Sequence, residues 1–172
     1  MAQADPRAVA TCQPEVQKER DGPMTLTVGF TGTQKGMTAN QKFTVYTILQ
    51  SYAALDHGTM VFRHGDCIGA DAEADKFAHA LGYYVITHPP VNESKRACCP
   101  DAWYEEPAKE YLERNKDIVH AASVMIATPG EREEVLRSGT WSTVRYAKKN
   151  WTTVLIVYPE GDVFLQEFTK RE

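Results

Sequence analysis

The stretch TLTVGFTGTQKGMT, residues 25–38, passes from a short β-type run through a glycine turn to the start of a helix. Two other glycine turns, HGDCIGAD at residues 64–71 and RSGTWSTVR at residues 137–145, are also preceded by apolar runs. Such turns present backbone N–H groups between a strand and a helix, where an open α/β sheet binds anions. The three turns therefore predict a nucleotide-phosphate site.

Apolar periodicity on both sides of these turns predicts strands and helices in alternation. The strand-type runs are short, and the helical runs carry apolar residues three and four positions apart. Thr38 with Gln41 matches a capping box, and Gly82 is typical of a helix end. We expect strands at residues 25–30, 59–62, 83–87, 123–127 and 152–158, and helices at residues 38–55, 70–81, 108–121 and 138–149.

This alternation is typical of an α/β protein with right-handed crossovers. We expect a three-layer, Rossmann-like open parallel sheet of about five strands, with helices on both faces. The expected strand order is 3-2-1-4-5, with a ligand crevice where the first and fourth strands diverge. The connection at residues 91–107 is longer than usual for such folds, and long connections are often functional lids.

The composition is that of one globular domain, with 172 residues of which 42% are hydrophobic and 24% charged. Residues 1–23 hold three prolines among polar and charged residues and have no sustained period. We therefore expect a flexible N-terminal arm at residues 1–23 and a single domain at residues 24–172.

A net charge of −4 gives no general attraction to nucleic acid or to anionic membrane, so we expect neither as a partner. The four cysteines include an adjacent pair, and the start of the chain lacks the apolar stretch of a secretory signal, which favours a cytoplasmic location. No apolar run approaches the roughly 20 residues needed to cross a bilayer. Sheet edges in small domains of this kind are often covered by self-association, so we expect a homo-oligomer.

The first and third turns supply the clearest candidates for phosphate binding. Small residues in the first turn allow the backbone to approach a phosphate, with Lys35 nearby as a source of charge. In the third turn, amides and hydroxyls converge at a helix start between Arg137 and Arg145, although a serine there is also simply a good N-cap. The candidates are Gly29, Thr31, Gly32 and Thr33 in the first turn, and Ser138, Gly139, Thr140 and Thr143 in the third.

The second turn carries His64, Gly65, Asp66 and Asp71. We interpret Asp66 as a helix cap, whereas Asp71 suits a ribose hydroxyl and a helix cap equally. His64 and Cys67 alone fall short of a zinc pattern, so we expect no metal site.

Two further residues are candidates with a structural alternative. His88 follows the third expected strand, where it is either a ligand contact or a packing histidine. Trp141 in the third turn suits stacking on a base, although large aromatic residues pack in cores far more often. The adjacent Cys98 and Cys99 do not form a C-x-x-C redox motif.

Three segments resemble motifs of the DNA-processing protein A domain. HGDCIGADAEADKFAHALG at residues 64–82 resembles SGxAxGID…AH…AL, YLERNKDIVHAAS at residues 111–123 resembles FPxRNRIIAxLS, and RSGTWSTVRYA at residues 137–147 resembles SGSLITAxxA. The chain is thus similar to the SLOG superfamily, which includes the Lonely Guy phosphoribohydrolases. The resemblance implies that Arg114, with Asn115 beside it, faces the ligand pocket.

Catalysis is where the chain departs from this resemblance. Lonely Guy enzymes have a PGGxGTxxE pattern whose glutamate assists cleavage, and SGTWST places Thr143 where that glutamate would fall. The remaining acidic candidates are Asp71, Glu133 and Glu134. Whether the chain is an enzyme is left open at this point; an enzyme of this kind would be an N-glycoside hydrolase of nucleoside monophosphates.

We therefore expect a protein that binds a nucleotide or a nucleotide-derived small molecule at the crevice, as a sensor, carrier or sequestering protein. A phosphoribohydrolase-type hydrolase is the first alternative. Single-stranded DNA binding, like that of DNA-processing protein A, is the second. We expect no cofactor to be required besides a nucleotide-type ligand.

Overall fold

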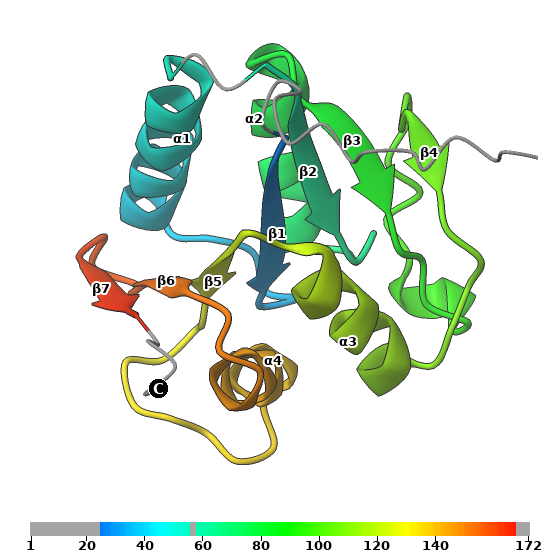
Figure 1. The fold of residues 1–172 in the computed structure, drawn as a ribbon. Helices are drawn as coiled ribbons and strands as arrows, with labels where there is room; N and C mark the ends of the chain where they lie inside the picture. Colours follow the sequence, from blue (N-terminus) through cyan, green and yellow to red (C-terminus); the bar gives the residue numbers. More distant parts are fainter. Residues whose placement is uncertain (1–24, 56–57, 168–172) are drawn as a thin grey trace, which may run out of the picture.

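The computed structural model describes residues 25–55 and 58–167. The expected arm at residues 1–23 lies outside these residues. Strands and helices alternate along the described chain (Figure 1). The elements are β1 (Leu26–Gly32), α1 (Ala39–Ala53), β2 (Met60–His64), α2 (Ala70–Ala80), β3 (Tyr84–Thr87), the 3-10 helix η1 (Glu93–Lys95), β4 (Tyr104–Glu105), α3 (Tyr111–Ala121), β5 (Val124–Thr128), α4 (Gly139–Lys149), β6 (Val154–Val157) and β7 (Val163–Gln166).

The strands form one sheet in the order β4-β3-β2-β1-β5-β6-β7. All neighbours are parallel except β6 and β7. The expected Rossmann-like architecture is confirmed, and its order 3-2-1-4-5 is the central part of this sheet. The expectation of about five strands was too low, because β4 and β7 add a short strand at each edge.

Each face of the sheet is covered by a pair of helices (Figure 1). On the side of α1 and α2, the core is built around Phe30, Leu49 and Phe62, all almost fully buried. On the side of α3 and α4, it is built around Ile118, Met125 and other buried apolar residues. The three layers leave the carboxyl ends of the parallel strands together at one edge, which positions the site.

Helix α1 begins with the expected capping box. The Gln41 amide donates to the Thr38 hydroxyl, and the Gln41 side-chain oxygen accepts from the Thr38 amide. The buried Gln41 side chain also donates from Nε2 to the carbonyls of Pro129 and Val157, at 2.9 Å each. One side chain therefore caps the helix and ties it to the ends of β5 and β6.

Gln41→Ala is expected to lower the free energy of unfolding by about 2–4 kcal/mol, because it removes half of the capping box and leaves two buried carbonyls without a donor. Gln50→Ala on the exposed side of the same helix should change it by less than about 0.5 kcal/mol. Urea denaturation of both variants measures this difference. Equal effects of the two substitutions would contradict the role given to Gln41.

Candidate functional site

A crevice of about 760 Å³ opens at the carboxyl edge of the sheet. It lies beyond the carboxyl ends of the neighbouring strands β1 and β5, between the turn that follows β1 and the segment that leads into α4. Among the sequence candidates, the residues that line it are Gly32, Thr33, Ser138, Gly139 and Thr140, together with Lys35 and Arg137.

The turn after β1 presents its backbone to the crevice. Gly32, where β1 ends and this turn begins, has no side chain. A Cβ on Gly32 would lie 2.4 Å from both the Ala70 Cβ and the Thr128 Oγ1. The Thr33 amide donates to the Thr128 carbonyl at 3.2 Å, and the Thr33 carbonyl accepts from the Gly36 and Ala70 amides. The turn is thus held against both β5 and the start of α2.

The opposite wall is the amino end of α4. The Ser138 hydroxyl caps this helix by accepting from the Trp141 amide at 3.3 Å. The amides of Gly139 and Thr140 have no acceptor within the part of the chain that the structure describes. Both amides belong to the first turn, where N–H groups and the helix dipole favour an anion.

The charges around the crevice also favour an anion. Lys35, Lys95 and Arg137 line it, against a single lining carboxylate, Glu131. Among residues 25–55 and 58–167, none of these three cations forms an ion pair. Arg145 lies outside the lining and donates to Glu134 and to the Leu136 carbonyl instead.

Apolar side chains line part of the same crevice. Leu112 and Leu136 are 57% and 81% exposed, and both line it together with Val135. Tyr111 lies beside the α4 end, since a Cβ on Gly139 would come 2.1 Å from the Tyr111 hydroxyl. The crevice therefore combines an end whose amides and charges favour an anion with an apolar surface.

The turn between β2 and α2 is buried rather than open to the crevice. The Asp71 carboxylate accepts from the Gly65 and Cys67 amides at 3.1 and 3.2 Å. Burial raises the pKa of the Asp71 carboxyl, while the Arg114 charge and the hydrogen bonds from the Cys67 and Gly65 amides act in the opposite direction. Asp71 thus stabilises the turn between β2 and α2 through these two hydrogen bonds.

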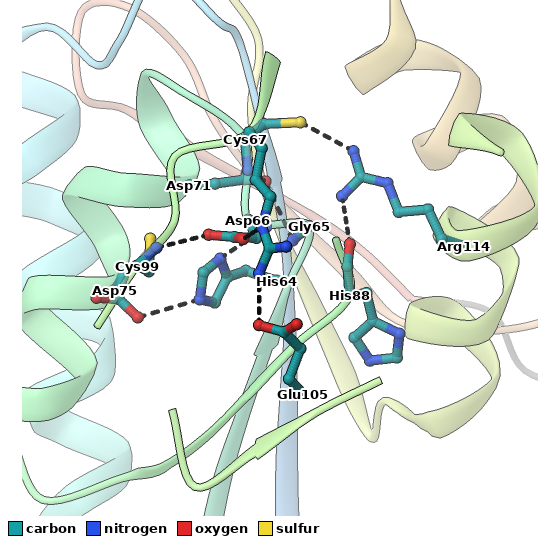
Figure 2. Close-up of polar contacts among 11 residues, drawn as sticks. His64, Gly65, Asp66, Cys67, Asp71, Asp75, His88, Cys99, Glu105 and Arg114 are labelled. Atoms are coloured by element: carbon teal, nitrogen blue, oxygen red, sulfur yellow. Dashed lines mark hydrogen bonds and ion pairs between the residues drawn. The ribbon is translucent and has the colours of Figure 1, made fainter. Parts of the chain in front are cut away.

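The expectation that Asp66 caps the following helix is wrong. The N-cap of α2 is Gly69, and no side chain caps this helix. Asp66 has a φ of +50°. Its carboxylate accepts hydrogen bonds from Arg96 Nε at 2.7 Å and from the Cys99 amide at 2.8 Å, not from the first turn of α2 (Figure 2). It thereby holds the loop after β3, which carries Lys95 to the crevice.

Arg114 is buried at 2% exposure and lies outside the crevice lining. Its guanidinium donates to the His88 carbonyl at 3.1 Å and to the Cys67 Sγ at 3.0 Å (Figure 2). It also lies 4.8 Å from the centre of the Tyr111 ring. Arg114 therefore supports Tyr111, which is the residue that reaches the crevice.

Asn115 and Thr143 join the two helices behind the crevice. Asn115 Nδ2 donates to the Thr143 hydroxyl at 2.8 Å, and that hydroxyl donates to the Gly139 carbonyl at 3.0 Å. Gly29 and Thr31 are buried in β1 and do not line the crevice. Trp141, the candidate for base stacking, is 4% exposed and packs in the core.

The acidic candidates for catalysis are not brought together. Asp71 is buried under its turn, whereas Glu133 and Glu134 are exposed on the loop before α4. Glu134 forms an ion pair with Arg145 at 2.8 Å. None of the three lines the crevice.

His88 is buried beside Arg63 rather than in the crevice. Arg63 Nη1 lies 3.1 Å from His88 Nε2 and has only hydrogens to offer, so the ring accepts there. Burial and then the Arg63 charge lower the pKa of His88 to about 3.

The structure also assembles a group that the sequence pattern did not reveal. One ligand atom each of His64, Asp75 and Cys99 lie within 4.8 Å of one another. We had considered His64 together with Cys67, but the Cys67 thiol meets Arg114 instead. Asp75 and Cys99 are 11 and 35 positions from His64, so no local spacing signals the group.

The chain shares its fold with several solved structures. A molybdenum cofactor binding protein from Rippkaea orientalis matches with a TM-score of 0.61, at 21% identity over 80% of this chain and 78% of that chain. The molybdenum cofactor carrier protein of Chlamydomonas reinhardtii has a TM-score of 0.52, at 17% identity over 77% and 76%. DNA processing protein A from Helicobacter pylori, studied for its single-stranded DNA binding, has a TM-score of 0.56, at 19% identity over 76% and 64%.

No protein-family model and no curated protein sequence matches the chain. The structural matches confirm the expected resemblance at the level of the fold, which the chain shares with DNA processing protein A and with the two molybdenum cofactor proteins. Within residues 25–55 and 58–167, no helix is both long and apolar enough to cross a membrane.

The expectation that no cofactor is required needs correction. Two of these neighbours are described as binding or carrying the molybdenum cofactor, and this finding contradicts the expectation.

As the pH is lowered below about 6.5, the free energy of unfolding is expected to decrease by up to about 1.4 kcal/mol per pH unit, because the buried His88 resists protonation. Its pKa of about 3 in the folded state lies below the unfolded value, so the unfolded chain binds more protons between these two values. Urea denaturation between pH 4.5 and 7.5 measures this slope. His88→Gln should make it shallower, and the exposed His120→Gln should not; equal slopes in all three proteins would exclude the role given to His88.

Proposed function

We propose that the chain binds a small-molecule cofactor with an anionic, phosphate-type group at the crevice between β1 and β5. The observation that carries this proposal is the amino end of α4. Two of its amides, which have no acceptor among residues 25–55 and 58–167, face a crevice lined by three cations that form no ion pair within the same residues. Local charge of this kind attracts an anion although the whole chain carries −4.

The lining also suggests the shape of the ligand. A volume of about 760 Å³ lies in the range of small-molecule and cofactor sites. The anionic group would lie against Gly139 and Thr140, and a flat, less polar body would lie against Leu112 and Leu136. This description covers nucleotide-derived molecules as well as the cofactor named by two of the structural neighbours, so the residues fit both.

Binding or carrying a ligand is favoured over hydrolysis because none of the acidic candidates for catalysis lines the crevice. Acid–base catalysis requires carboxylates within reach of the bond that is cleaved. Asp71 is buried, and Glu133 and Glu134 lie outside the crevice lining. The sensor, carrier or sequestering role expected from the sequence is therefore the one we propose.

Native mass spectrometry of the gently purified protein, followed by denaturation and identification of any released molecule, is the first test. We expect a released nucleotide-type molecule or molybdenum cofactor at a fixed ratio to the chain. If the protein is empty, thermal unfolding is measured with a panel of nucleotides and with molybdenum cofactor. A ligand at 100 times its Kd should stabilise the fold by about 2.7 kcal/mol. No shift with any compound would refute the proposal, and binding of single-stranded DNA alone would favour the DNA-binding alternative.

Arg137→Glu is expected to weaken binding of the identified ligand about tenfold or more, because it places a carboxylate beside the anionic group. Lys76→Glu is the matched control, since Lys76 is exposed on α2 and does not line the crevice. Isothermal titration calorimetry of both variants gives the comparison. The same loss in both would indicate a general charge effect rather than a contact in the crevice.

A further inference from the structure

The group formed by His64, Asp75 and Cys99 comes from three separate parts of the fold. His64 ends β2, Asp75 lies in the middle of α2, and Cys99 lies in the loop that Asp66 holds in place. His64 Nε2 is 3.1 Å from Asp75 Oδ1, and both side chains are almost fully buried. The Cys99 Sγ completes a set of nitrogen, oxygen and sulfur donors (Figure 2).

Asp75 is a buried carboxylate that no lysine or arginine pairs with among the described residues. Its partners there are two imidazoles, His64 at 3.1 Å and His79 at 3.5 Å. The Asp66 amide donates to His64 Nδ1, so the ring carries one proton, on Nε2, and is neutral. A metal ion bound beside Asp75 would supply a fixed counter-charge for this buried carboxylate.

His79 lies beside this group but is not part of it. Its Nε2 is inaccessible to solvent, has no hydrogen-bond partner among the described residues, and lies 3.5 Å from the Asp75 oxygen. It is not among the donors whose ligand atoms lie within 4.8 Å of one another, so the protein ligands are His64, Asp75 and Cys99. Three protein ligands leave the fourth position of a tetrahedral zinc ion to water.

We propose that His64, Asp75 and Cys99 bind one divalent transition-metal ion of the zinc class, with water at the fourth position. A set of one imidazole, one carboxylate and one thiolate suits zinc and its substitute cobalt, and it excludes magnesium and calcium, which take oxygen ligands. The site does not line the crevice between β1 and β5, and it does not depend on the function proposed for that crevice.

Metal binding exchanges protons in a defined way. The Cys99 thiol loses its proton to solvent and forms a thiolate–metal bond. His64 moves its proton from Nε2 to Nδ1, so that Nε2 coordinates and the hydrogen bond from the Asp66 amide is lost. One hydrogen bond is a small loss against the binding of a metal ion by three protein ligands. The site therefore releases one proton for each ion bound.

The test uses the full chain after dialysis against a chelator, titrated with Co²⁺ and then with Zn²⁺. Wild-type protein should bind one Co²⁺ and develop a thiolate-to-cobalt charge-transfer band, which Zn²⁺ abolishes by displacement. Zn²⁺ binding in weak buffer should release one proton per ion and raise the melting temperature. Absence of the band in the wild-type protein overturns the proposal without the need for any variant.

Cys99→Ser and Cys98→Ser form the matched pair of variants. Cys98 is adjacent in sequence but exposed and outside the donor set, so Cys98→Ser should keep the band and the affinity. Cys99→Ser should lose the band and bind Co²⁺ at least about 100-fold more weakly. Far-ultraviolet circular dichroism checks that both variants fold. A band that survives in Cys99→Ser, or one that disappears in Cys98→Ser, would place the metal elsewhere.

Discussion

The carboxyl edge of the sheet depends on a close approach of three chain segments at the end of β1. Gly32 leaves no space for a Cβ between Ala70 and Thr128. Backbone hydrogen bonds of Thr33 then join β1 to β5 and to the first residue of α2. Because this contact is made by backbone, the floor of the crevice is fixed without side chains that would fill it. The crevice beside α4 therefore depends on the close packing of Gly32 against Ala70 and Thr128.

The central fold could be predicted because its signals are local. Apolar periodicity located the helices, and the Thr38–Gln41 pair marked the start of α1 within one residue. The order of the five central strands followed from the rule for right-handed crossovers. The two edge strands could not be predicted in this way. Strand β4 has only two residues, both exposed, and β7 has no alternation of buried and exposed positions.

The candidate site was predictable only where its residues follow one another in the chain. The turns at residues 32–33 and 138–140 line one crevice, as their place between strand and helix implied. Asp66 was misread as a cap because its partners, Arg96 and Cys99, lie about 30 positions away. Long-range pairs of this kind have no signature in a single sequence. The same holds for the meeting of His64 with Asp75 and Cys99.

The buried guanidinium of Arg114 links the second turn to α3, and it does so by occupying space as well as by donating hydrogen bonds. A Cβ on Gly65 would lie 1.4 Å from Arg114 Nη1, so no residue except glycine fits there while the arginine is present. The residue at position 65 is thus sterically constrained by the residue at position 114. In homologous chains, loss of the arginine would free position 65 to accept a larger residue, and these two positions should co-vary.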